Sequence, residues 1–296
     1  MSKPQTPTLS PADMSSTPAP RARRRRPMQL NALVGLTLLA ILTLVALLGL
    51  VWTPHDPVRL DLLTRLQPPS AAHWLGTDEY GRDVLSRLMV GAHTSLWVSL
   101  LTVIVAVTCG TILGLLAGYL RGNVDRVLMM INDTLLAFPG ILMALALMAI
   151  IGPSQYGIIL ALSIAYTPSV VRVVRSSVLS LREREFVEAS RVIGNSELYT
   201  MLRHVAPNCV APVCVIATSM FGWTILAESS LSFLGLGVPP PAATWGNMLA
   251  ASRPFIASAG WLGLFPGMCI ALSLLAFNLA GDALRDRLDP RMRTLQ

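Results

Sequence analysis

The sequence predicts an all-α membrane protein with six transmembrane helices and both termini in the cytoplasm. Hydrophobic residues make up 53% of the 296 residues, charged residues only 13%, and the mean hydropathy is +0.59. Soluble domains carry about 25% charged residues, so this chain has too few charges to cover a surface that faces water. Several stretches without a charged residue exceed the roughly 20 residues that cross a bilayer as a helix.

The first transmembrane helix is expected directly after a basic tail. Residues 1–30 begin rich in Pro, Ser and Thr and end in a run of Arg, which is typical of a disordered segment. The uncharged run from Asn31 to Trp52 is longer than the apolar core of a secretory signal peptide, which spans roughly 7–15 residues. We therefore expect 31–52 to be an uncleaved span, followed by an external segment over 53–91.

Five more spans are expected within residues 92–281. The uncharged run 134–171 divides at Gly152-Pro153, which is typical of a turn, whereas 229–252 contains three consecutive prolines and cannot form an ordinary spanning helix. In the second helix, glycines recur at every fourth position, a spacing that lets another helix approach closely. The expected helices are 31–52, 92–120, 127–151, 157–176, 208–228 and 260–281, and the glycines are Gly110, Gly114 and Gly118.

The basic residues determine the expected orientation, because cytoplasmic loops of membrane proteins carry an excess of Lys and Arg. With a cytoplasmic N-terminus, 18 of the 23 Lys and Arg residues fall on the cytoplasmic side. They lie in 1–30, 119–126, 172–206 and the cytoplasmic tail 282–296. The net charge of +7 is therefore a signal of topology, and we expect the lipid bilayer, rather than nucleic acid, as the surrounding partner.

The scarcity of lysine excludes one class of activity. Lys3 is the only lysine, and a P-loop needs a lysine after its glycine-rich turn to reach the nucleotide phosphates. The chain therefore cannot hydrolyse ATP by a P-loop mechanism, and we expect it to hold no cofactor. If transport is driven by ATP, separate subunits must use the ATP and Mg.

The largest expected cytoplasmic loop, residues 181–207, has the pattern of two short helices, and we call it the elbow. Gly194 followed by Asn195 predicts a left-handed stop, and Ser196 is suited to cap a second helix that Pro207 ends. Apolar faces are expected at Phe186, Ala189 and Ile193 in the first helix and at Leu198, Met201, Leu202 and Val205 in the second. The elbow is either an amphipathic hairpin on the lipid surface or a lever that inserts into a cytoplasmic ATPase.

The elbow carries a resemblance to a known family. Glu188-Ala189-Ser190, Gly194 and Pro207 resemble the EAA loop of ABC-importer permeases, although Ser190, His204 and Ala206 depart from that pattern. Further segments, covering roughly 73–290, are similar to the C-type permease subunit of dipeptide and oligopeptide importers. They are His73 to Asp83, Asp133 with Leu136 to Pro139, Glu228 to Gly237, Trp245-Gly246, and Arg285-Asp286 with Leu288-Asp289-Pro290.

The resemblance implies a type I ABC importer permease fold in a bacterial inner membrane. It implies a heterodimer with a second, homologous permease subunit, two cytoplasmic P-loop ATPase subunits and an external substrate-binding protein. The residues implied to form the ATPase-coupling loop are Glu188, Ala189, Ser190, Gly194 and Pro207. The implied cargo is a dipeptide or oligopeptide, with nickel as the alternative within the same family.

Several charged or metal-binding residues allow more than one interpretation or need one to be weighed. Asp133 and Glu228 lie inside or at the edge of spans, where charge is costly, and they serve either in permease packing, at the pore edge, or in a proton relay. Arg82 and Asp83 of the external segment either contact the binding protein or cargo, or form a local salt bridge. The four histidines have none of the spacings of metal motifs, so we expect no metal site; they are His55, His73, His93 and His204.

Two other classes of protein compete with an ABC permease. A proton-coupled secondary transporter would use intramembrane acids and often internal repeats, and no inverted repeat is visible. An intramembrane enzyme would need paired acids, a Ser–Lys pair or a metal set at one depth. The sequence has no such constellation, so we expect a permease subunit without enzymatic activity.

Overall fold

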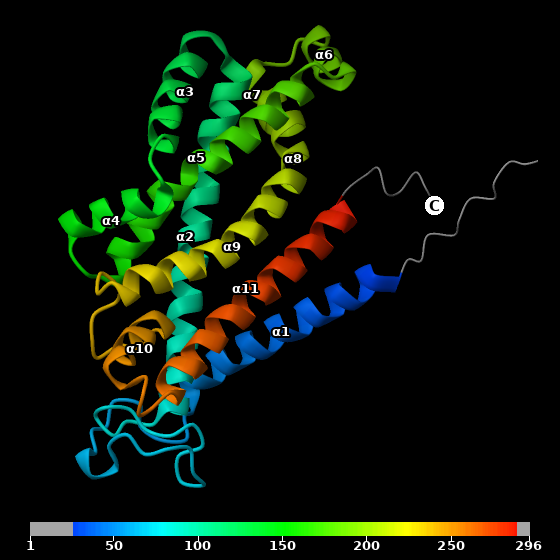
Figure 1. Cartoon of the computed structure of the whole chain (residues 1–296). Helices are drawn as coiled ribbons and strands as arrows, with labels where there is room; N and C mark the ends of the chain where they lie inside the picture. The colour runs from blue at the N-terminus through cyan, green and yellow to red at the C-terminus, as the bar shows by residue number, and fades with distance from the viewer. Residues whose placement is uncertain (1–25, 289–296) are drawn as a thin grey trace, which may run out of the picture.

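A computed structural model of the chain describes residues 26–288, and within this range it is built of helices joined by loops (Figure 1). The long helices are α1 (Arg26–Val51), α2 (Val84–Leu120), α3 (Gly122–Leu136), α4 (Gly140–Ile151), α5 (Gln155–Arg182), α9 (Val210–Phe233) and α11 (Trp261–Leu288). Short helices are η2 (Leu62–Thr64), α6 (Glu185–Val192), α7 (Glu197–Thr200), the π-helix η3 (Met201–Val205), α8 (Ala206–Asn208), α10 (Trp245–Ala251) and η4 (Arg253–Phe255).

Five of these helices, α1, α2, α5, α9 and α11, are long and apolar enough to cross a membrane. The pair α3 and α4 meets the same criterion together but is bent by 88°, so the described residues contain six spans if the pair counts as one. The expected continuous helix over 127–151 is therefore wrong. Pro139 precedes α4 at its N-cap, and a proline disfavours the helical conformation of the residue before it, here Phe138.

The helix ends differ from the expected ones because the helices continue beyond the uncharged runs into sequence that contains charged residues. Helix α2 begins at Val84 rather than 92, since Asp83 caps it by accepting a hydrogen bond from the backbone N–H of Ser86. Helices α5 and α11 likewise continue past the last residue of their uncharged runs, and α1 begins within the range expected to be a tail. The expected disorder of 1–25 and the last tail residues, 289–296, lie outside the described residues.

The tightest helix contact joins α2 to α5 and confirms the close approach predicted from the glycine repeat. A Cβ atom on Gly110 would lie 2.5 Å from Cβ of Val170, one on Gly114 2.7 Å from Val174, and one on Gly118 2.8 Å from Val178. All three valines are fully buried. Two helix backbones can come this close only when one of them lacks side chains along the contact.

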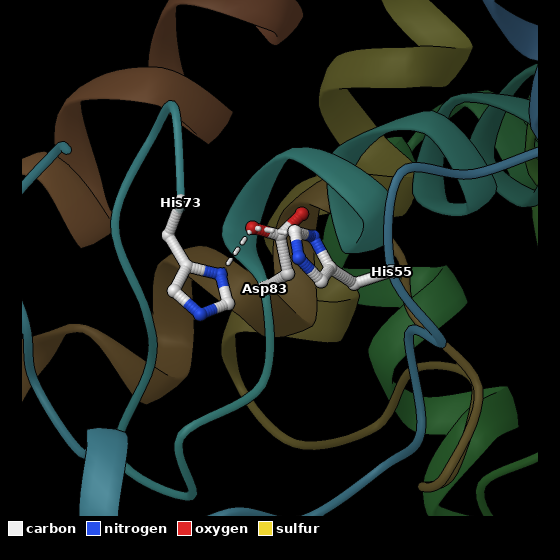
Figure 2. Close-up of side chains that lie close together, drawn as sticks. All are labelled: His55, His73 and Asp83. Carbon is white, nitrogen blue, oxygen red and sulfur yellow. Dashed lines mark hydrogen bonds and ion pairs between the residues drawn. The ribbon is translucent and has the colours of Figure 1, made fainter. Parts of the chain in front are cut away.

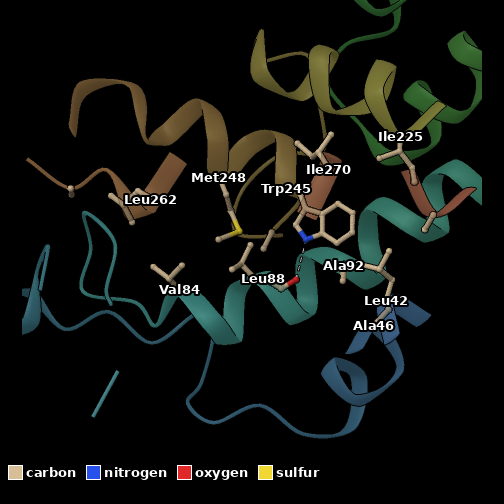
Figure 3. Close-up of a cluster of buried hydrophobic side chains, with 13 residues drawn as sticks. Leu42, Ala46, Val84, Leu88, Ala92, Ile225, Trp245, Met248, Leu262 and Ile270 are labelled. Atoms are coloured by element: carbon tan, nitrogen blue, oxygen red, sulfur yellow. Dashed lines mark hydrogen bonds between the residues drawn. The ribbon is translucent and has the colours of Figure 1, made fainter. Parts of the chain in front are cut away.

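A second core joins α10 to the early turns of α2 (Figure 3). The Trp245 indole is 1% exposed, and its Nε1 donates a hydrogen bond to the carbonyl oxygen of Leu88 at 3.2 Å. Val84, Leu88 and Met248 belong to the same buried cluster. Figure 1 shows α10 and the loops of residues 53–83 at one end of the molecule, and α6 and α7 of the elbow at the other.

Candidate functional site

The elbow is the candidate functional site, and its predicted turn chemistry is confirmed. Helix α6 ends before Gly194, whose φ of +90° is the left-handed conformation expected of it. Ser196 caps α7 by accepting a hydrogen bond from the backbone N–H of Tyr199 at 3.2 Å. Acidic residues in the first turn of α6, Glu185 and Glu188, complement the positive end of the helix dipole.

One side of the elbow packs against the spans. Val187 and Val205 are fully buried, and Met201 nearly so; they join the core formed by α2, α5 and α9. The Ser190 and Thr200 hydroxyls lie 3.0 Å apart and connect α6 to α7. Helix α7 begins the second arm of the elbow, which continues through η3 and α8. The elbow is therefore fixed to the ends of the transmembrane helices.

The remaining surface of the elbow, which we call the outer face, exposes apolar side chains. Val192 is 81% and Ile193 79% exposed. The outer face consists of Phe186, Val192, Ile193, Leu198 and Leu202, all exposed. Apolar surface in water is unfavourable, and exposed apolar patches are typical of surfaces that contact a partner or a membrane.

Two expectations about the elbow are wrong. Leu198, Met201, Leu202 and Val205 do not share one face, because the π-helix Met201–Val205 changes the angular spacing and buries only Met201 and Val205. Pro207 does not end the second helix; it occupies the first turn of α8, where its missing N–H costs little, and the chain continues almost directly into α9.

The implied coupling residues differ in accessibility. Glu188, Ala189, Gly194 and Pro207 are exposed, and Cβ of a side chain at Gly194 would meet no atom within 4 Å. Ser190 is 4% exposed, and Asn195 Nδ2 donates a hydrogen bond to its hydroxyl at 3.1 Å. Ser190 therefore holds the elbow together from inside and does not present its side chain to a partner.

A set of polar contacts that the sequence analysis missed connects the elbow to α2. The Tyr119 hydroxyl donates a hydrogen bond to Glu197 Oε2, which also accepts one from Arg191 Nη2 at 3.2 Å. Arg182 Nη1 donates to the carbonyl oxygen of Tyr119 at 2.6 Å. The hydrogen bonds from Tyr119 and Arg191 hold the pKa of Glu197 below its usual range. These residues lie far apart in sequence and follow no motif, so only the fold reveals the link.

We expect Tyr119→Phe to reduce the transport rate by about two- to tenfold, because the part-buried hydrogen bond from Tyr119 to Glu197 contributes about 0.5–1.5 kcal/mol. The measurement is substrate uptake per amount of inserted protein. Tyr156→Phe is the matched control, since Tyr156 is an exposed tyrosine in the first turn of α5. Equal uptake by the two variants would contradict a mechanical link through Glu197.

The acids of the spans have local partners. Asp133 Oδ1 accepts a hydrogen bond from Arg172 Nη2 at 2.9 Å, which joins α3 to α5. Glu228 is fully buried and accepts a hydrogen bond from the hydroxyl of Ser232 at 2.8 Å. No part of the side chain reaches a surface of this chain, and its role in packing or at the pore edge stays a prediction.

In the external segment, the salt-bridge alternative applies to Arg82. Its Nε donates to Asp78 Oδ2 at 2.7 Å, and its Nη2 lies 3.4 Å from Glu79 Oε1. The side chain of Asp83 is 2% exposed and caps α2, whereas a contact of Asp83 with a binding protein or cargo stays a prediction. Contrary to the expectation of scattered histidines, His55 and His73 both face Asp83 (Figure 2).

The fold and the elbow together define a class of protein. Five or six apolar spans are packed closely, and an elbow fixed to their ends presents an apolar outer face beyond them. This is the architecture of a membrane permease. The chain belongs to the family of binding-protein-dependent transport system inner membrane components, whose model matches residues 110–294. It is accordingly a multi-pass protein of the bacterial inner membrane.

Individual relatives extend this likeness over nearly the whole chain. A putative peptide transport system permease protein of Brucella suis is 42% identical over 286 residues, covering 97% of this chain and 96% of the relative. The dipeptide transport system permease protein DppC of Alkalihalophilus pseudofirmus is 44% identical, covering 89% and 86%. The nickel transport system permease protein NikC of Escherichia coli is 38% identical, covering 88% and 94%.

Proposed function

We propose that this chain is a permease subunit of an ATP-driven importer of short peptides and that the elbow couples it to a cytoplasmic ATPase. The observation that carries the coupling role is the two-sided elbow, apolar and exposed on its outer face and bonded to the spans on its inner side. A hairpin lying on the lipid surface would also expose apolar residues. It would not need the contacts of Glu197 with Tyr119 and Arg191 that fix the elbow relative to α2.

Movement of the ATPase reaches the spans by two routes. The second arm of the elbow continues through α8 into α9, so a displacement of the outer face turns or tilts that helix. The Tyr119 and Arg182 contacts transmit the same displacement to α2 and α5. Because α2 and α5 are locked along the glycine contact, they move as one body, and the pore alternates between outward- and inward-facing states.

The partners follow from this mechanism. Nucleotide chemistry takes place in two P-loop ATPase subunits, which bind ATP and Mg, and this chain is not itself an enzyme. Glu188, Ala189 and Gly194 contact one ATPase, while Ser190 supports them from within. A second, homologous permease completes the pore, an external binding protein delivers the substrate, and both termini lie in the cytoplasm with the elbow.

Peptide is the proposed cargo because the relatives that cover most of this chain at 42–44% identity are named as peptide or dipeptide permeases. The nickel permease at 38% identity supports nickel as the alternative. In either case the binding protein selects most of the cargo, and the permease supplies the gated path.

Deletion of the gene is expected to abolish uptake of a labelled dipeptide. The measurement uses cells that lack other peptide importers, with external peptidases blocked, and radioactive nickel is supplied in a parallel assay. Restoration of dipeptide uptake by the intact gene, with nickel uptake unchanged, supports peptide cargo. Unchanged dipeptide uptake with lost nickel uptake would replace peptide by nickel and leave the permease architecture in place.

A further inference from the structure

Three potential metal-ligand atoms converge in the external segment (Figure 2). His55 follows the end of α1, His73 lies in the following loop, and Asp83 directly precedes α2. Asp83 Oδ1 lies 2.9 Å from His73 Nδ1 and 3.6 Å from His55 Nδ1. All three atoms lie within 4.8 Å of one another, although they come from three separate stretches of chain.

These distances suit a small divalent ion. Zinc bonds to imidazole nitrogen and carboxylate oxygen at about 2.0–2.1 Å, which places tetrahedral ligand atoms about 3.3 Å apart. The two distances from Asp83 Oδ1, 2.9 and 3.6 Å, bracket that separation. Imidazole nitrogens with a carboxylate oxygen favour ions such as Zn²⁺ and Ni²⁺ over the harder Mg²⁺ and Ca²⁺.

Hydrogen bonds from neighbouring groups orient the three side chains, as hydrogen bonds to the ligands do in metal sites. The backbone N–H and the hydroxyl of Ser86 both donate hydrogen bonds to Asp83 Oδ2, at 2.8 and 2.7 Å, which leaves Oδ1 for the imidazoles. The backbone N–H of His55 donates to the same Ser86 hydroxyl at 3.0 Å. A turn holds His73, whose carbonyl oxygen accepts from the N–H of Ser70 at 2.8 Å.

The site is open on one side. The Asp83 side chain is 2% exposed and that of His73 16%, whereas that of His55 is 45% exposed. An ion can therefore enter past His55, and a water molecule can complete its coordination. The buried carboxylate supplies the negative charge that favours a cation over a neutral ligand.

We propose that His55, His73 and Asp83 bind a divalent transition-metal ion of the zinc and nickel class, which clamps the external segment onto the start of α2. The ion stays bound as part of the structure. The proposal depends on neither the peptide cargo nor the coupling role of the elbow.

Metal binding is tested on the purified full-length chain in lipid nanodiscs, prepared with a tag that contains no histidine and stripped with a chelator. Zn²⁺ alone and Ni²⁺ alone are titrated against a coloured competing chelator. We expect one ion to bind per chain and His55→Ala and His73→Gln each to weaken binding by at least about tenfold. His93→Ala and His204→Ala are the matched controls and should leave the affinity unchanged.

Hydrogen exchange of residues 53–83 provides the second measurement. Zn²⁺ should slow exchange in the wild-type chain and have no effect in the His55→Ala/His73→Gln double variant. Asp83 is left intact because its replacement would also remove the cap of α2. Equal affinity of the wild type and the double variant for both ions would overturn the site, in which case His73 and Asp83 form only a hydrogen bond. Tight binding without slower exchange would overturn the clamp.

Discussion

Gly194→Arg is expected to abolish uptake while the chain still inserts and folds. Gly194 lies beside Val192 and Ile193 of the outer face, so an arginine there places a charged, bulky side chain on the proposed docking surface. The fold has room for it, since Cβ would meet no atom within 4 Å. The positive φ of +90° adds a backbone cost of only about 1–2 kcal/mol, which a protein of this size can tolerate.

A matched variant distinguishes a loss of uptake caused by blocked docking from one caused by backbone strain. Gly152, between α4 and α5, also has a positive φ, +87°, and open space at Cβ, but it is not part of the elbow. Gly152→Arg should therefore insert and transport normally. The measurements are uptake, the amount of chain in the membrane fraction, and co-purification of the ATPase subunits. Normal uptake by Gly194→Arg would refute the docking role, and equal loss in both variants would attribute the effect to strain.

Gly114→Val should prevent the folded chain from accumulating. Its Cβ would lie 2.7 Å from Cβ of Val174 and 2.9 Å from the carbonyl oxygen of Val171, and neither backbone can move without breaking the α2–α5 contact. Overpacking of a core costs typically about 1–3 kcal/mol. Because the contacts at Gly110 and Gly118 are equally close, separation at one position opens all three, and we expect the upper end of that range or more.

Thermal stability of the detergent-purified chain, followed by size-exclusion chromatography after heating, measures this effect. Gly267→Val is the control, because Gly267 lies within helix α11 and a Cβ there would meet nothing within 4 Å. Gly114→Ala should be destabilising on its own and partly rescued by Val174→Gly, which removes the Cβ and Cγ1 atoms that the new methyl group strikes. A wild-type melting temperature for Gly114→Val would mean that α2 and α5 do not pack as described.

The predictable parts of this protein are those set by short stretches of sequence. The glycine repeat predicted the close helix contact because removal of side chains at every fourth position clears one face of a helix, whatever lies opposite. Gly194 and Ser196 predicted the elbow turn because their backbone and capping preferences act within a few residues. The break at Pro139 has an equally local signal in the proline itself, whereas the apolar character of residues 127–151 does not reveal it.

The accessibility of the elbow residues could not be predicted from the local sequence pattern alone. Ser190 belongs to the family-like motif and yet is buried, because Thr200 and Asn195 fold back onto its hydroxyl. Leu198 and Leu202 become part of the outer face only because a π-helix follows α7. A helical period of 3.6 residues cannot anticipate either outcome, since both depend on how the second arm meets α2 and α5.

The sequence by itself determined that the chain is a polytopic membrane protein, roughly where its spans lie, and that its own residues cannot form a P-loop. These properties are additive over neighbouring residues, because each apolar side chain favours the bilayer independently of the rest of the fold. Only the tertiary structure decided which side of the elbow is free, that Tyr119 and Glu197 meet, and that His55 and His73 converge on Asp83. Those contacts depend on the packing of helices distant in sequence, so no local spacing encodes them.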